Sequence, residues 1–258
     1  MSADPQSLPH AVVTGGGTGI GLAIARSLAA THRVTIVGRR AAVLREAAAG
    51  IDGIVQPLAV DVTDGAALAQ ALAEARQGFG PVTVLVNNAG AARSGSIADQ
   101  DEAALLEVLE LNLVQVHRCI RLVLPDMLEA RAGRIVNIAS TAGLLGYPFV
   151  SAYCAAKHAV VGLTRALALE LVRKGVTVNA VCPGYTDTDL VSAQVENLSR
   201  RSGGDEASIR QKLTQSVPLG RLIRPDEVAA AVEYLCRADA AAVTGQALVV
   251  AGGEYMAG

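Results

Sequence analysis

The chain has 258 residues, of which 51% are hydrophobic and 18% charged, and its formal net charge is -2 at pH 7. This length and apolar content allow one large domain with a substantial core, and the balanced charge gives no basic field to gather nucleic acid or an anionic membrane surface. The first residues lack the regions of a signal peptide, and no apolar run reaches the ~20 residues of a membrane helix. We therefore expect a soluble, cytoplasmic protein with no nucleic-acid or membrane partner.

The cysteines are scattered, with no C-x-x-C pair and no neighbouring histidine cluster, at Cys119, Cys154, Cys182 and Cys236. We expect them to be small buried hydrophobic residues of a protein in a reducing compartment. The sequence therefore predicts neither a disulfide framework nor a metal site.

Short β-branched runs alternate with longer alanine- and leucine-rich stretches of helical period. The runs fall at 11–15, 33–39, 54–62, 82–90, 133–140, 176–184 and 246–253. The first six lack strict alternation of polar and apolar residues, as expected of strands covered on both faces. Alternation of strand and helix along the whole chain favours an α/β fold with a doubly wound parallel sheet of about seven strands.

Two segments in the C-terminal part of the chain have sequence features that predict their local structure. Residues 224–235 are typical of a helix, because Pro225 suits the first turn and two acidic residues follow it. The polar stretch 199–208 predicts either an exposed loop or part of a mobile lid over a site, the lid covering about 188–217. No linker, repeat or low-complexity segment divides the chain, so we expect one domain.

A glycine-rich turn, "TGGGTGIG" from Thr14 to Gly21, joins the first strand to the first helical stretch. In a parallel sheet this turn presents free N–H groups and the positive end of a helix to a ligand. Gly15, Gly19 and Gly21 would let a diphosphate approach the backbone, and Thr14 and Thr18 can hydrogen-bond locally. The spacing differs from the commonest dinucleotide fingerprint, G-x-G-x-x-G. A tight turn without a ligand therefore stays open as the alternative.

Further motifs stand at the ends of later strands. "NNAG" follows the fourth strand, Ser140 ends the fifth, and Tyr153 and Lys157 lie four apart at the start of a helical stretch, where both can face one cleft. With "TGGGTGIG", "LNL" around Asn112 and "CPG" after the sixth strand, the chain closely resembles the short-chain dehydrogenase/reductase family from about residue 10 to residue 253. The resemblance implies a single Rossmann-type domain that binds a dinucleotide and carries out catalysis over residues 1–258.

The same residues suggest a chemistry. A nicotinamide cofactor delivers only a hydride, so reduction of a ketone also needs a proton donor. Tyr153 can be that acid, or the base in oxidation, if the ammonium of Lys157 lowers the pKa of the phenol from its ordinary value near ~10. Ser140 would hydrogen-bond the substrate oxygen as charge develops. The resemblance further implies that Lys157 reaches the nicotinamide ribose and that Asn112 holds a water in a proton relay; surface packing and helix capping are the plain alternatives.

The end of the second strand, "VTIVGRR", bears on the choice of cofactor. Gly38 stands where NAD-preferring relatives carry an aspartate for the ribose hydroxyl, and the guanidinium of Arg39 can bind a 2′-phosphate. We expect NADP, with NAD as the alternative, because Thr18 stands where many NADP-dependent relatives carry a second basic residue. The expected cofactor contacts are Thr14, Gly15, Gly17, Thr18, Gly19, Ile20, Gly21, Arg39, Asp61, Val62, Asn88, Ala89, Gly90, Tyr153, Lys157, Pro183, Gly184, Thr186 and Thr188.

The expected substrate pocket is mostly apolar. By resemblance Leu144, Leu145, Tyr147 and Tyr185 would line it, which suits a hydrophobic ketone better than a sugar. The C-terminal half is similar to 3-oxoacyl thioester reductases and polyketide ketoreductases, so we expect an NADP-linked ketoreductase for a 3-oxoacyl thioester or a similar ketone, assembled as a homotetramer. The alternatives are an NAD-dependent secondary alcohol dehydrogenase and a non-catalytic nucleotide-sensing protein.

Five cationic residues cluster where the lid and the pocket rim are expected: Arg93, Arg200, Arg201, Arg210 and Lys212. The plain interpretation is solvated surface charge. The alternative is that some of them meet the phosphates of a coenzyme A or carrier-protein arm.

Overall fold

The computed structural model describes residues 8–256, except the side chains at 190, 193, 194, 197, 198, 201 and 202. Its centre is a seven-stranded parallel sheet in the order β3-β2-β1-β4-β5-β6-β7. The strands are β1 (His10–Thr14), β2 (Arg33–Gly38), β3 (Val55–Ala59), β4 (Val82–Asn87), β5 (Gly133–Ile138), β6 (Val176–Pro183) and β7 (Ala247–Val250). The strand order reverses between β1 and β4, the place where ligands bind in doubly wound sheets, so the expected fold class is confirmed.

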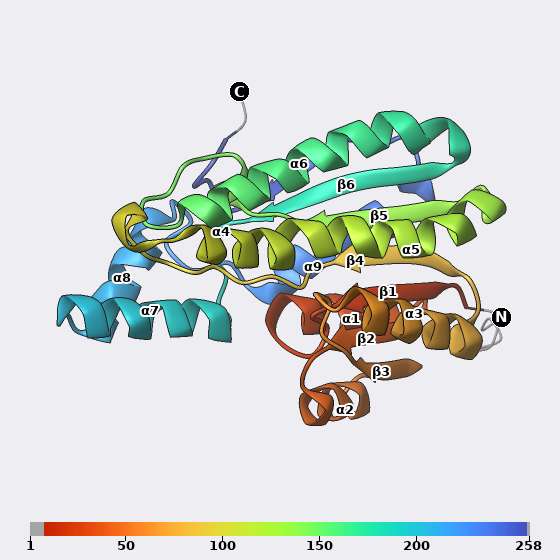
Figure 1. The fold of residues 1–258 in the computed structure, drawn as a ribbon, viewed down its shortest axis with the longest axis horizontal. Coiled ribbons are helices and arrows are strands. Elements are labelled where there is room, and N and C mark those ends of the chain that lie inside the picture. Colours follow the sequence, from red (N-terminus) through yellow and green to blue (C-terminus); the bar gives the residue numbers. More distant parts are fainter. Residues whose placement is uncertain (1–7, 257–258) are drawn as a thin grey trace.

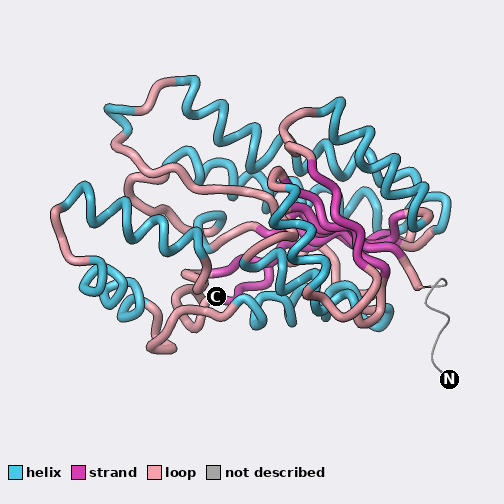
Figure 2. Tube along the Cα trace, turned by 90° about the horizontal axis from the view of Figure 1, so that it is seen from below, coloured by secondary structure: helices cyan, strands magenta, loops and turns pink. Residues whose placement is uncertain are grey.

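Helices lie on both sides of the sheet (Figures 1 and 2). They are α1 (Gly19–Ala29), α2 (Ala41–Ala49), α3 (Gly65–Phe79), α4 (Glu102–Leu109), α5 (Gln115–Ala130), α6 (Ser151–Leu171), α7 (Asp189–Ser202), α8 (Glu206–Ser216) and α9 (Pro225–Cys236). A π-helical segment, Glu110–Val114, joins α4 to α5, and a short 3-10 turn, Thr141–Gly143, follows β5. The helix expected at 224–235 is α9.

Each face of the sheet carries its own apolar core. On one face α1, α2 and α9 pack through side chains such as Ile24 and Val228. On the other face α3, α5 and α6 pack through side chains such as Ile120 and Val160. All eight residues of β6 are buried. Both faces of this strand are covered, so even its polar residues Thr177 and Asn179 are buried.

One strand departs from that expectation. β3 forms the edge of the sheet, and of its five residues only Leu58 is buried. Pro57 is tolerated there because an edge strand has one side without a hydrogen-bonded neighbour. The third run therefore meets that expectation only in part: α2 and α3 contact β3 from opposite faces, but most of its residues are only half-buried.

The polar stretch 199–208 is not a loop. Helix α7 continues to Ser202 and α8 begins at Glu206, with Gly203 in the left-handed region at a φ of 67° between them. Asp205 caps α8 by accepting a hydrogen bond of 3.0 Å from the Ser208 N–H. Figure 1 shows this helical pair set apart from the sheet, on the side to which the arrowheads of β5 and β6 point.

The four cysteines are buried free thiols. Burial raises the pKa of Cys119 to about 12, so this thiol stays protonated and unreactive. Between residues 8 and 256, the structure contains no helix that is both long enough and apolar enough to pass through a bilayer.

Candidate active site

A cleft of about 880 Å³ lies where the carboxyl ends of the strands meet the turns that follow them. It brings together the glycine turn, the end of β2, the turn after β3, "NNAG", Ser140, the start of α6 and the segment after β6. All the expected cofactor contacts except Thr14 line this cleft. These segments are distant in sequence, so the parallel topology assembles the site.

The turn after β4 stabilises the glycine turn through hydrogen bonds. The Asn88 side chain donates hydrogen bonds to the carbonyls of Thr14 at 2.9 Å and Gly15 at 3.2 Å. Gly15 has a φ of 66°, which favours glycine. A Cβ at Gly21 would collide with the Gly15 carbonyl oxygen, so the first turn of α1 can pack this closely only with glycine there.

Thr14 does not line the cleft, and its side chain has a structural role. Its side chain is fully buried, and its hydroxyl oxygen accepts hydrogen bonds of 3.0 Å from the N–H groups of both Asn88 and Ala89. The hydroxyl is used in joining the end of β1 to the turn after β4. The expectation that Thr14 contacts a ligand is therefore corrected: this residue shapes the turn from behind.

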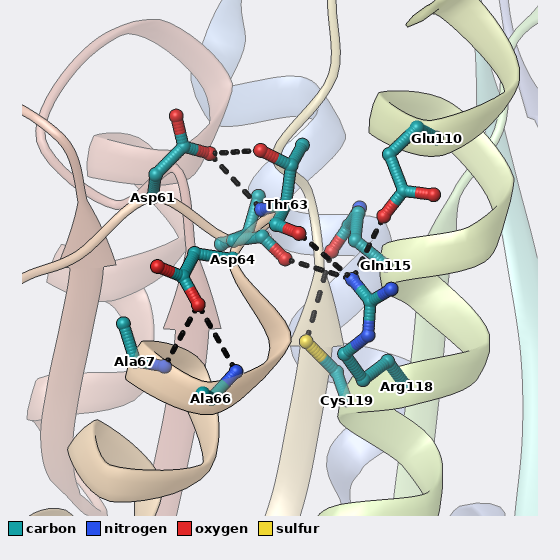
Figure 3. A network of polar contacts seen from close by, with 10 residues as sticks. Asp61, Thr63, Asp64, Ala66, Ala67, Glu110, Gln115, Arg118 and Cys119 are labelled. Carbon is teal, nitrogen blue, oxygen red and sulfur yellow. Dashed lines mark hydrogen bonds and ion pairs between the residues drawn. The ribbon is translucent and has the colours of Figure 1, made fainter. Parts of the chain in front are cut away.

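A second polar network holds the turn after β3 (Figure 3). Asp61 accepts hydrogen bonds from the N–H of Thr63 at 3.0 Å and its hydroxyl at 2.8 Å, and these bonds lower the pKa of the carboxyl. Arg118 on α5 donates to the carbonyls of Val62 and Thr63 at 3.4 and 3.3 Å, and it pairs with Glu110 at 2.9 Å. Sequence reasoning missed Arg118, because no motif marks a contact between α5 and the turn after β3.

The end of β2 leaves room in the cleft. A Cβ at Gly38 would have no neighbour closer than 3.6 Å, the nearest being a methyl carbon of Leu44. The exposed side chains of Arg39 and Arg40 both line the cleft beside it, as does Thr18. The second arginine supplies a further cation that the sequence argument did not assign.

Tyr153 and Lys157 stand on successive turns of α6, and Ser140 faces them from the end of β5, all three lining the cleft. Lys157 Nζ lies 5.5 Å from the centroid of the Tyr153 ring and donates a hydrogen bond of 2.8 Å to the carbonyl of Ile138. Ser140 accepts a hydrogen bond of 3.1 Å from the Ala142 N–H and so also caps the 3-10 turn. Capping and lining the cleft are compatible for this serine.

Burial governs the protonation of this pair. It raises the pKa of Tyr153 to about 12, with a hydrogen bond from Ser140 opposing the rise, and it lowers the pKa of Lys157 to about 8. The net lowering of the pKa of Tyr153 that was expected from the ammonium is not found, because burial sets the direction of the shift. The ammonium is directed to the Ile138 carbonyl, and the cost of burying a phenolate outweighs its attraction.

Asn112 lies in the π-helical segment, buried below the cleft. Its amide nitrogen donates hydrogen bonds of 3.0 Å to the carbonyls of Ala91 and Val108, and its Oδ1 has no hydrogen-bond partner among the described residues. A Cβ at Gly90 would lie 2.7 Å from Oδ1 and 3.4 Å from Lys157 Nζ. An unsatisfied acceptor and the lysine ammonium therefore both border Gly90.

Of the four residues expected to form the substrate wall, two line the cleft. Tyr147 and Tyr185 line the cleft, and their rings meet edge to face with centroids 6.3 Å apart. Leu144 and Leu145 do not line it, because both N–H groups donate to the carbonyl of Thr141 and the chain curls away in a helical turn. Leu144 packs against the core below α5 and α6, and Leu145 is exposed. Lining residues that the sequence argument missed are Thr141, Pro148, Phe149, Val150, Val191 and Leu213.

Three of the five clustered cations have acidic partners. Arg93 pairs with Glu107 at 2.8 Å, Arg210 with Asp187 at 2.5 Å, and Arg200 with Glu196 at 3.7 Å. The side chain of Arg201 lies outside the described part of the chain, and Lys212 is exposed. The ion pairs favour the interpretation of this cluster as solvated surface charge.

Comparison with known proteins agrees with this geometry. Residues 9–199 match the family model for short chain dehydrogenase. The chain is 44% identical over 255 residues to a granaticin polyketide synthase putative ketoacyl reductase of Streptomyces violaceoruber, covering 95% of this chain and 92% of that protein. It is 38% identical over 250 residues to a D-beta-hydroxybutyrate dehydrogenase of Rhizobium meliloti, covering 94% and 97%.

A solved structure gives the same result in three dimensions. The crystal structure of a variant of actinorhodin polyketide ketoreductase with NADPH superposes with a TM-score of 0.92 at 42% identity, covering 96% of this chain and 98% of that one. Three findings agree: the family model matches more than half of the chain, the relatives align over nearly their whole length, and the fold is shared. The chain belongs to the short-chain dehydrogenase family.

Proposed function

We propose that this chain is an NADPH-dependent ketoreductase that reduces a hydrophobic ketone, with 3-oxoacyl thioesters as the favoured class. Family membership makes it an oxidoreductase with a nicotinamide cofactor. The observation that carries the proposal is the meeting of Ser140, Tyr153 and Lys157 in one cleft with the glycine turn and two arginines. Relatives described as ketoacyl reductases, and a ketoreductase solved with NADPH, support the direction and the cofactor.

The residues present fit a phosphorylated dinucleotide. Gly15, Gly17 and Gly19 line the cleft at the N-terminus of α1, where backbone N–H groups and the helix dipole favour a diphosphate. Gly38 leaves open space beside Arg39 and Arg40, whose guanidinium groups can bind a 2′-phosphate. When bound, the nicotinamide supplies the hydride.

The protein supplies the proton. With its pKa raised to about 12, Tyr153 keeps its proton at neutral pH until the ketone oxygen gains negative charge, so it acts as a general acid. Ser140 would donate a second hydrogen bond to the same oxygen and stabilise the developing charge. The free Oδ1 of Asn112 and the ammonium of Lys157, both beside Gly90, can hold a water between them that returns a proton to the tyrosine.

A second candidate is oxidation of a secondary alcohol with NAD. It draws support from the relative described as D-beta-hydroxybutyrate dehydrogenase and from Thr18, which is uncharged where a second basic residue would favour NADP. The two arginines beside Gly38 favour the NADPH reductase.

We further propose a cytoplasmic homotetramer in which residues 188–217, the α7 and α8 pair, close over bound substrate. Four buried free thiols suit a reducing compartment. Exposed apolar side chains on the helices beside the sheet, Leu105, Leu106, Val114 and Leu169, suit burial between copies. Val191 of α7 and Leu213 of α8 line the cleft, so movement of this pair would change access to it. Light scattering on the purified protein tests the assembly.

A panel of ketones and acyl thioesters, assayed with NADPH and with NADH at the nicotinamide absorbance, tests the function. We expect turnover of 3-oxo esters and thioesters with NADPH preferred. Preference for NADH with secondary alcohols would favour the second candidate. Absence of turnover with every pair, despite tight NADPH binding, would favour the non-catalytic alternative.

A further inference from the structure

The segment after β7 brings an acidic side chain to the back of the substrate wall. Glu254 Oε1 accepts a hydrogen bond of 2.5 Å from the hydroxyl of Tyr147, and the same hydroxyl lies 2.9 Å from the hydroxyl of Thr141. A phenol has one hydrogen to donate. Because the carboxylate can only accept, Tyr147 donates to Glu254 and receives the hydrogen of Thr141. The chain of bonds therefore runs in one direction and ends on a negative charge.

The second carboxylate oxygen is not compensated. Glu254 Oε2 is buried and has no hydrogen-bond partner among the described residues, and Glu254 forms no ion pair with them. It sits against Gly184, where a Cβ would lie only 2.5 Å from it. Gly184 and Tyr147 both line the cleft. The carboxylate therefore stands directly behind the cleft surface, in a place that depends on glycine at position 184.

Among the residues that the structure describes, no cation is paired with this carboxylate. Burial and the carboxylate of Glu254 both raise the pKa values of Tyr147 and Tyr185, so the two phenols stay neutral. Of the cations that line the cleft, Arg39 and Arg40 stand beside the end of β2. Arg93 pairs with Glu107 and Lys157 donates to the Ile138 carbonyl. The tyrosine wall of the cleft thus carries a carboxylate that forms no ion pair with the described residues.

We propose that Glu254 determines substrate specificity by excluding anionic substrates, so that the cleft accepts neutral 3-oxo esters and thioesters and rejects free 3-oxo acids. This inference rests on the proposed ketoreductase function and specifies its substrate class. The hydroxyl of Tyr147 is bonded to that of Thr141, the residue next to Ser140, so the tyrosine wall begins beside the proposed ketone site. A 3-oxo acid carries its carboxylate two bonds from the reacting carbonyl, so a ketone held by Ser140 and Tyr153 would bring that charge towards this wall. Repulsion between like charges across a partly buried wall is strong enough to change relative rates by about 10-fold or more.

The test compares two substrates of matched size, acetoacetate and its methyl ester, with saturating NADPH. We expect the wild-type protein to prefer the ester by at least about 10-fold in kcat/KM. In Glu254→Gln, which keeps the shape and the hydrogen bond from Tyr147, kcat/KM for acetoacetate should rise by about 10-fold, mostly through a lower KM, while the ester changes by less than about threefold. The matched control is Glu74→Gln, which removes the same charge from an exposed position on α3 and should change neither substrate.

A second variant separates charge from shape. Tyr147→Phe removes the hydroxyl and leaves Glu254 in place, so discrimination against acetoacetate should persist. Parallel changes for both substrates in Glu254→Gln, or loss of discrimination in Tyr147→Phe alone, would show that Glu254 only positions the wall and would overturn the inference. A wild-type protein that reduces acetoacetate as well as its ester would also overturn it while leaving the proposed reductase intact. Failure to reduce either ketone would instead count against the proposed function itself.

Discussion

The ammonium of Lys157 lies 5.5 Å from the centroid of the Tyr153 ring, yet its hydrogen bond goes to the backbone carbonyl of Ile138. The two side chains share one buried corner of the cleft without bonding each other. Burial favours the neutral form of each, as their opposite pKa shifts show. The arrangement keeps a proton on the phenol and places a cation where it can stabilise a phenolate once the proton has left.

Replacing Tyr153 with phenylalanine should abolish proton donation while preserving the fold. We expect ketone reduction to fall by roughly 10³-fold or more in kcat, with the NADPH dissociation constant changed by less than about threefold. Steady-state absorbance and titration of NADPH fluorescence measure the two quantities. Tyr234→Phe, at an exposed tyrosine on α9, is the matched control. Near-normal turnover in Tyr153→Phe would remove this residue from the mechanism.

The buried lysine should cost stability in a pH-dependent way. Its pKa is about 8 in the fold and 10.5 when unperturbed, a difference worth roughly 3 kcal/mol. Below about pH 8 both the folded and the unfolded state hold the proton, so the penalty is constant. As pH rises toward 10.5, only the unfolded state still holds the proton, so the penalty disappears.

Lys157→Met should therefore be more stable than wild type at pH 7, by up to roughly 3 kcal/mol, and this advantage should shrink between pH 8 and 10.5. Urea unfolding of both proteins at a series of pH values measures the difference. An advantage that stays constant across this range would mean that it arises from packing and not from the charge.

Cofactor preference should respond to the end of β2. Gly38→Asp combined with Arg39→Ala places a carboxylate where a 2′-phosphate would lie and removes one guanidinium. We expect the ratio of kcat/KM for NADPH to that for NADH to fall by roughly 100-fold. Adding Arg40→Ala should lower it further, because Arg40 also lines the cleft. If the wild-type protein already favours NADH, the interpretation of "VGRR" is wrong.

Replacing Gly21 tests the close approach between α1 and the glycine turn, and replacing Gly162 on α6 is the control. Gly21→Ala would drive a methyl group into the Gly15 carbonyl, so we expect lost NADPH binding and a fall in the melting temperature of several degrees. A Cβ at Gly162, in the middle of α6, would meet nothing within 4 Å. Gly162→Ala should therefore raise stability by about 0.5–1 kcal/mol and leave binding unchanged, as thermal unfolding would show.

The sheet and the motif residues were predictable because they depend on local patterns. β6 is recognisable as a strand from its short run of β-branched residues, and the parallel topology then places Ser140, Tyr153 and the glycine turn at one edge. Where two structures share a local pattern, the sequence could not decide between them, and the loop interpretation of residues 199–208 was wrong. The polar, glycine-containing stretch 199–208 is equally compatible with a loop and with the junction of two capped helices.

The rest depends on contacts that no local pattern encodes. Arg118 reaches the turn after β3 only because α5 crosses behind it, and Glu254 reaches Tyr147 across 107 positions of the sequence. Leu144 and Leu145 were assigned to the pocket because they follow Ser140, but the turn that begins at Thr141 directs them elsewhere. The direction of the pKa shift of Tyr153 was misjudged because the sequence does not reveal how strongly the fold shields this phenol from water.

The position of Asn112 depends on the number of residues in the π-helical segment Glu110–Val114. A regular α-helix turns by about 100° for each residue, so deletion of one residue here would let α4 and α5 join as one uninterrupted helix while rotating one relative to the other. Asn112 would then leave its place beside Gly90. Proteins of this fold that differ by a single residue in this segment would keep Ser140, Tyr153 and Lys157 and still lose the acceptor next to the lysine. If the proposed water between Asn112 and Lys157 carries the proton, an insertion or deletion between α4 and α5 should impair proton transfer as a substitution of Asn112 would.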